Sequence, residues 1–184
     1  MKTVYIVLTG TKTVLSRIIK LYTKQPYNHA SFSFDPNLSR VYSFGRKVPW
    51  NPFFGGFSIE NVTGGFFKYA SCEIFSLQVT DEEYIKMKEF VENIEEQEKK
   101  YGYNFIGLIG VVLDRPIERK KAYFCSQFVA TLLSKNTSVR FDKLTGLVTP
   151  EDIRNNAALV KEYEGTLDMY LDDFIIAYAP LNVQ

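Results

Sequence analysis

The chain has 184 residues, of which 46% are apolar and 23% charged, and its net charge is +1. This length is typical of one domain with a substantial buried core, so we expect residues 1–184 to form a single domain. The 22 basic and 21 acidic residues form no basic stripe, which argues against nucleic-acid binding. Two cysteines give no disulfide framework, and the apolar runs are too short for a leader or a membrane span. We expect a cytoplasmic protein.

Alternation of apolar and polar residues, and β-branched or aromatic runs between turn residues, predict the strands. These strands fall at residues 3–8, 29–34, 40–44, 57–62 and 71–79. Residues 159–178 predict one or two further strands, the last ending at Tyr178.

Helical spacing of apolar residues, together with capping residues, predicts the helices. These helices fall at residues 11–22, 81–99, 103–113 and 125–135, with a further one starting at Thr149. Thr80 and Glu83 have the spacing of a capping box. Because the helices mainly lie between two groups of strands, we expect an α+β fold with helices packed on an antiparallel sheet or barrel.

Residues 45–65 carry two prolines, five glycines and several aromatic side chains. A loop of this length is more often functional than idle. We therefore expect Trp50 to contact a substrate. Glu60, near the end of this segment, is expected on a sheet edge or a groove wall.

Cys125 is the first residue of the predicted helix 125–135, and the apolar spacing behind it turns it toward the core. The start of a helix carries unpaired backbone N–H groups, which lower the pKa of a thiol and can hold an oxyanion. His29, the only histidine, lies on a predicted strand and could take the proton of the thiol. The alternatives are a buried core cysteine and a structural histidine.

Two motifs, His29-Ala-Ser-Phe-Ser33 on a strand and Tyr123-Phe-Cys-Ser-Gln-Phe-Val129 on a helix, resemble the circularly permuted branch of the NlpC/P60 superfamily. That branch includes YiiX-like hydrolases and is related to lecithin:retinol acyltransferase-like proteins. The resemblance covers roughly residues 3–133 and implies a papain-like fold in which the histidine strand precedes the cysteine helix. It also implies that Cys125 is the nucleophile and His29 the general base.

The third catalytic residue is open between two candidates. Ser43, on the neighbouring strand of the hairpin, matches the position where the family more often has a carboxylate, an amide or a histidine. Glu60 has better chemistry for orienting an imidazole and stabilising its cation, and we favour it slightly. Tyr123 and Gln127 are candidates for contacts with the substrate, although Gln127 could instead cap the helix.

These residues predict a cysteine hydrolase, a peptidase or amidase, that works through an acyl-enzyme. The resemblance implies that its substrates are small peptide or cell-wall-derived amides. One alternative is a lipid acyltransferase or lipid-ester hydrolase, with the aromatic segment 50–57 facing the lipid. Another is a non-catalytic binding module of the same fold, because Ser43 is a weak orienting group. We expect no metal, since one histidine and two distant cysteines give no recognised ligand spacing. We also expect no cofactor and no membrane contact.

Overall fold

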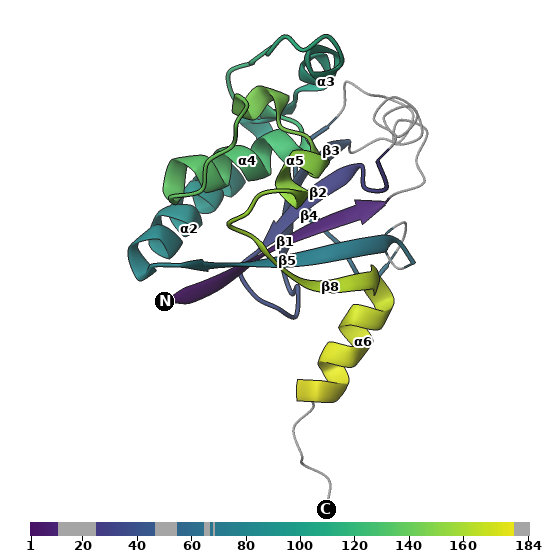
Figure 1. Ribbon diagram of the computed structural model, residues 1–184. Coiled ribbons are helices and arrows are strands. Elements are labelled where there is room, and N and C mark those ends of the chain that lie inside the picture. Colours follow the sequence, from purple (N-terminus) through teal and green to yellow (C-terminus); the bar gives the residue numbers. More distant parts are fainter. Residues whose placement is uncertain (11–24, 47–54, 65–66, 68, 179–184) are drawn as a thin grey trace, which may run out of the picture.

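The structure, a computed structural model, describes residues 1–10, 25–46, 55–64, 67 and 69–178. Its strands form a mixed sheet of eight in the order β7-β6-β4-β3-β2-β1-β5-β8 (Figure 1). The strands are β1 (Lys2–Gly10), β2 (His29–Ser33), β3 (Val41–Arg46), β4 (Gly55–Glu60), β5 (Ser71–Val79), β6 (Gly102–Tyr103), β7 (Ala122–Tyr123) and β8 (Val160–Thr166). The α-helices are α2 (Asp81–Glu96), α3 (Phe105–Val112), α4 (Cys125–Asn136), α5 (Pro150–Arg154) and α6 (Leu167–Tyr178). Two 3₁₀ turns are η1 (Glu98–Lys100) and η2 (Thr145–Leu147).

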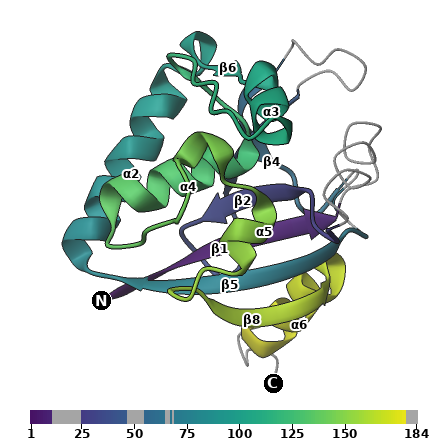
Figure 2. The same cartoon turned by 45° about the horizontal axis from the view of Figure 1, so that its top comes forward.

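Helices cover both faces of the sheet because successive strand residues point to opposite sides. On β1, Ile6 belongs to the larger core, which α2 and α4 cover, whereas Val7 belongs to a smaller core beside α6. Figure 2 shows α2 and α4 side by side on one side of the strands and α6 beyond β8. The sequence thus builds an α+β fold with two unequal apolar layers.

Most strand and helix predictions are confirmed. Alternation in residues 29–34 gives β2, and β5 spans the same residues as predicted. At the start of α2, the Glu83 N–H donates to Thr80 Oγ1 at 3.1 Å and the Thr80 N–H donates to Glu83 Oε2 at 2.9 Å, which is the predicted capping box. The predicted helix at 11–22 and Trp50 lie outside the described residues.

Two predictions are wrong. The sheet is not wholly antiparallel, because β6 and β7 pair in parallel, with Gly102 opposite Ala122. A helical crossover, α3, joins these two short strands, and such a connection allows parallel pairing. Residues 174–178 belong to α6 and not to a strand. Three apolar residues at helical spacing, Leu167, Tyr170 and Leu171, pack in the smaller core at the start of α6. Their burial outweighs the strand preference of the later β-branched pair, Ile175 and Ile176.

Aromatic packing holds α4 on the sheet. The Phe128 ring lies 5.2 Å from that of Phe44 on β3 and 6.2 Å from that of Phe57 on β4. Buried aromatic pairs contribute beyond their buried area. This packing holds the first turn of α4 against the central strands.

A buried carboxylate joins β5, α5 and β8. The Glu73 side chain is fully buried and accepts hydrogen bonds of 2.7 Å from both Arg154 Nε and Nη2. Lys161 Nζ lies 3.5 Å from the same carboxylate. The hydrogen bond from Arg154 lowers the pKa of Glu73 despite burial, so the pair is ionised at neutral pH.

Replacing Arg154 by alanine should destabilise the fold by about 3 kcal/mol at neutral pH, because it leaves the Glu73 carboxylate buried without its main partner. Because the pKa of Glu73 is lower in the folded protein than in the unfolded chain, the ion pair stabilises the fold fully at any pH above the unfolded value of about 4.3. This stabilisation is lost as the pH falls through the pKa that Glu73 has in the folded protein. Urea unfolding should therefore show a difference from wild type that narrows in acid. Lys88→Ala, which breaks an exposed ion pair with Glu92, should change stability by less than about 0.5 kcal/mol. Equal effects of the two variants would show that the buried pair stabilises the fold no more than an exposed one.

Candidate active site

His29 and Glu60 meet across a strand that lies between them. His29 is the first residue of β2, Glu60 is the last of β4, and β3 separates the two strands. His29 Nε2 lies 2.5 Å from Glu60 Oε1, and Ser31 Oγ donates to Glu60 Oε2 at 2.5 Å. The side chains of His29 and Glu60 are only 15% and 7% exposed. The carboxylate is therefore held at both oxygens, one of them by the imidazole.

Ser43 lies between the same groups on β3 but has a different main contact. Its Oγ is 3.4 Å from His29 Nε2, whereas it donates to the backbone oxygen of Ala30 at 2.9 Å. A hydroxyl has one proton to donate, and that proton goes to the backbone. Of the two candidates for orienting the imidazole, Glu60 makes the shorter and charge-assisted contact.

Cys125 begins α4, as predicted, and contacts the imidazole of His29. The residue is 7% exposed, and its Sγ hydrogen-bonds with the His29 side chain and accepts from the backbone N–H groups of Ala30 and Ser126. Phe124 precedes the helix and provides no side-chain cap. The first amides of a helix have no intrahelical acceptor, so they remain available to an anion.

The pair shifts both protonation equilibria toward the ionised form. Burial raises the pKa of the Cys125 thiol, but the His29 charge and the hydrogen bonds from His29 and the two backbone N–H groups outweigh it and lower that pKa below its usual value. Burial likewise opposes the imidazolium, yet Glu60 and Cys125 hold the pKa of His29 well above 6.5. Near neutral pH, these shifts favour a thiolate beside an imidazolium.

The contacts also assign the two ring nitrogens. Glu60 and Ser43 both lie at Nε2 of His29, which leaves Nδ1 as the nitrogen for the thiol. An imidazole fixed at one nitrogen by a carboxylate can exchange a proton at the other. The arrangement can thus generate a thiolate and return a proton to a leaving group.

The first turn of α4 is held by neighbouring polar groups. Gln127 Oε1 accepts from the Phe124 N–H at 3.4 Å and from Asn104 Nδ2 at 3.2 Å, and Ser126 Oγ donates to the Val148 backbone oxygen at 2.7 Å. Gln127 thus caps the helix, the alternative that the sequence left open. Its predicted contact with a substrate stays a prediction.

Tyr123 lies two residues before the thiol and packs among aromatic rings. Its ring stacks on Tyr101 at 6.3 Å with an angle of 14° and meets Phe44 edge-on at 5.1 Å. Burial raises the pKa of the Tyr123 hydroxyl. A role for Tyr123 in substrate binding likewise stays a prediction.

Sequence reasoning missed two side chains of this site. Ser31 holds the second oxygen of Glu60, and the Phe67 ring lies 5.8 Å from the imidazole of His29. The alternation of β2 places Ser31 on the face of His29, so the pattern contained a signal for it. Phe67 follows a loop, and no periodic pattern indicates its place.

The described residues contain no cluster of three or more His, Cys, Asp or Glu side chains that could hold a metal ion.

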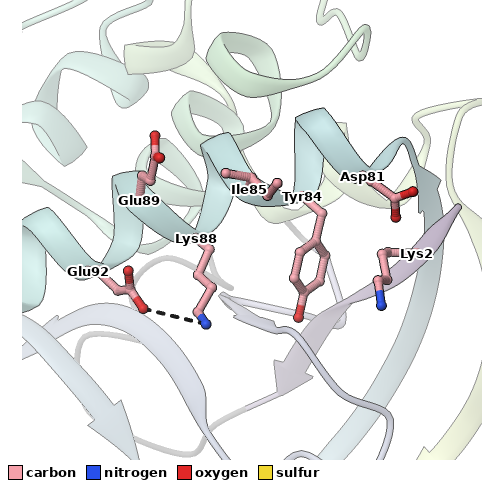
Figure 3. Close-up of a pocket in the computed structure, with 7 residues that line it drawn as sticks. All are labelled: Lys2, Asp81, Tyr84, Ile85, Lys88, Glu89 and Glu92. Atoms are coloured by element: carbon pink, nitrogen blue, oxygen red, sulfur yellow. Dashed lines mark ion pairs between the residues drawn. The ribbon is translucent and has the colours of Figure 1, made fainter.

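A hollow separate from the Cys125 site lies along α2 and the start of β1, and Figure 3 shows its charged lining. Its lining residues are Lys2, Asp81, Tyr84, Ile85, Lys88, Glu89 and Glu92. None of the four predicted catalytic residues is among them.

The thiols should differ sharply in reactivity. Cys125 should be alkylated by iodoacetamide near neutral pH, because its pKa is lowered and the thiolate is the reactive form. Cys72 is fully buried, and burial raises its pKa to about 12, so it should stay unmodified in the folded protein. Peptide mapping by mass spectrometry separates the two sites. Labelling of both thiols at the same slow rate would contradict the ion pair.

A scan against models of known protein families finds no match, and a search of curated proteins finds no significant match. The chemistry of the site is therefore inferred from the positions of the side chains and from the two motifs. The observation that carries most weight is the contact of Cys125, His29 and Glu60, which come from three separate elements.

Proposed function

We propose that this protein is a cysteine hydrolase that cleaves an amide through a covalent acyl-enzyme. The contact between a helix-start thiol and an imidazole that a carboxylate holds at its other nitrogen supports this proposal. The motif resemblance supports a permuted papain-like fold and small peptide amides as substrates. The alternative, a non-catalytic binding module, was motivated by Ser43 as a weak orienting group. The contact of the Glu60 carboxylate with His29 favours the catalytic proposal over this alternative.

In the proposed reaction, the Cys125 thiolate attacks the carbonyl carbon of the amide. Backbone N–H groups in the first turn of α4 stabilise the oxyanion. The His29 imidazolium gives its proton to the nitrogen that leaves, and the carbon–nitrogen bond breaks to give a thioester.

Water then attacks the thioester while the neutral His29 takes a proton from it. The carbon–sulfur bond breaks, the acid leaves, and Cys125 and His29 return to the thiolate and imidazolium. In each half of the cycle, Glu60 stabilises the charged form of the ring. His29 gives one proton to the leaving nitrogen and regains one from water, so the cycle needs no reagent besides the amide and water.

Cys125→Ala should abolish this hydrolysis, lowering the rate by about 10⁴-fold or more, because no other group in the site can form the thioester. A panel of acyl-dipeptide anilides provides the substrates, and intact-mass spectrometry of quenched reactions should show an acyl adduct on the wild type but not on Cys125→Ala. Cys72→Ala is the matched control and should keep both activity and adduct. Iodoacetamide-sensitive hydrolysis that survives in Cys125→Ala would rule out the mechanism.

Glu60→Gln should shift the dependence of Cys125 alkylation on pH upward by about one unit, because the loss of the anion lowers the pKa of His29 and so raises that of the thiol. Hydrolysis should fall by about 100-fold. Ser43→Ala should move the profile much less, since its hydroxyl donates to Ala30. A larger shift in Ser43→Ala than in Glu60→Gln would reverse the assignment of the orienting group.

A further inference from the structure

The short helix α3 exposes an aliphatic surface. Ile106, Ile109, Val112 and the adjoining Leu113 are between 43% and 60% exposed. Leu108 and Val111, on the other side of the helix, pack against the larger core. These positions recur at helical spacing, so α3 is apolar both toward the protein and toward solvent.

This surface is concentrated, whereas other exposed apolar side chains of the described residues are dispersed. Ile85 on α2, Val160 on β8 and Met169 on α6 each lie on a different element. Residues 105–113 contain no charged side chain. In both views α3 lies at the end of the molecule away from α6 (Figures 1 and 2). An exposed apolar cluster of this kind indicates an interaction surface.

Basic side chains adjoin this helix in the sequence and in the sheet. Residues 114–121 carry four basic and two acidic residues, the acids being Asp114 and Glu118. The Gly102 N–H donates to the Lys121 backbone oxygen at 2.9 Å, which brings the lysines of η1 beside this segment. The basic residues of the two stretches are Lys99, Lys100, Arg115, Arg119, Lys120 and Lys121.

None of these six cations appears among the salt bridges of the described residues, in contrast to Arg40 with Glu95 and Lys86 with Glu82. Arg119 and Lys121 do contact uncharged oxygens, the backbone oxygen of Tyr103 at 3.5 Å and Gln97 Oε1 at 3.0 Å. Within the described residues, no carboxylate partner neutralises the positive charge of these six basic side chains. Exposed aliphatic side chains beside such cations complement the interface of an anionic bilayer.

We propose that α3 and the basic residues beside it form a docking surface for an anionic lipid bilayer. With eight residues, α3 is about 12 Å long and lies in the interface, with Ile106, Ile109 and Leu113 among the lipid acyl chains. No helix of the described residues combines the length and the hydropathy required to cross a bilayer. The sequence, with its short apolar runs, led us to expect no membrane contact, and the exposure of α3 is what changes that expectation.

Docking would place the candidate active site near the lipid surface. Asn104 caps α3, where its Oδ1 accepts from the Gly107 N–H at 3.0 Å, and its Nδ2 donates to Gln127 at 3.2 Å. Gln127 belongs to the first turn of α4, two residues from Cys125. The docking helix and the nucleophile helix are thus joined by one buried side chain.

Co-sedimentation of the full chain with phosphatidylcholine vesicles, with and without phosphatidylglycerol, tests this surface. Wild type should bind the anionic vesicles, and binding should weaken as salt rises. Ile109→Asn with Leu113→Asn should weaken binding at least tenfold. Arg115→Gln with Lys120→Gln should weaken it by about fivefold per charge. The charge variant leaves the apolar residues intact, so it tests the surface even if the first variant does not fold.

Matched changes on α2, Ile85→Asn and Lys86→Gln, should leave vesicle binding unchanged, as should Cys125→Ala, because docking does not require the thiol. Failure of wild type to bind anionic vesicles would overturn the proposal. Equal losses in the α2 controls would also overturn it. Sedimentation equilibrium gives a third contradicting outcome: a wild-type dimer that the α3 variants convert to monomers. In that case α3 would be an interface between two copies of the chain.

Discussion

The hydrogen bond between the imidazole of His29 and the carboxylate of Glu60 depends on the register of three strands. Val41 on β3 lies opposite Ser33 on β2 and opposite Glu60 on β4. A slip of one residue in either pairing would turn the side chains of that strand to the other face. The imidazole would then lose the anion that raises its pKa, and the thiol would lose the cation that lowers its own. The proposed chemistry at Cys125 thus depends on the sheet register as much as on the thiol.

Burial acts against this arrangement, and the surrounding donors compensate for it. A buried thiolate or imidazolium loses the solvation of water, so each charge must be stabilised within the protein. The imidazole stabilises the thiolate together with the N–H groups of Ala30 and Ser126, while Glu60 stabilises the imidazole. Ser31 in turn donates to Glu60. The chain of contacts shows why polar residues occupy this end of an otherwise apolar sheet.

Local patterns predicted the elements that hold the site, but not the contacts made between distant elements. Alternation placed His29 on β2, and apolar spacing placed Cys125 at the start of α4. The choice between Ser43 and Glu60 depends on the pairing of β3 with β4, which no local pattern records. The parallel pair β6 and β7 was missed because two-residue strands carry too little periodicity. The strand predicted at 174–178 was wrong because burial of Leu167 and its neighbours decided the helix.

The most direct test is the titration of His29, followed by the NMR signals of its ring. His29 is the only histidine of the chain, so these signals need no further assignment. The ion pair predicts that the ring stays protonated well above pH 6.5 and that its pKa falls in Cys125→Ala, where the thiolate is absent. A ring that titrates near 6.5 in both proteins would contradict the pairing of Cys125 with His29.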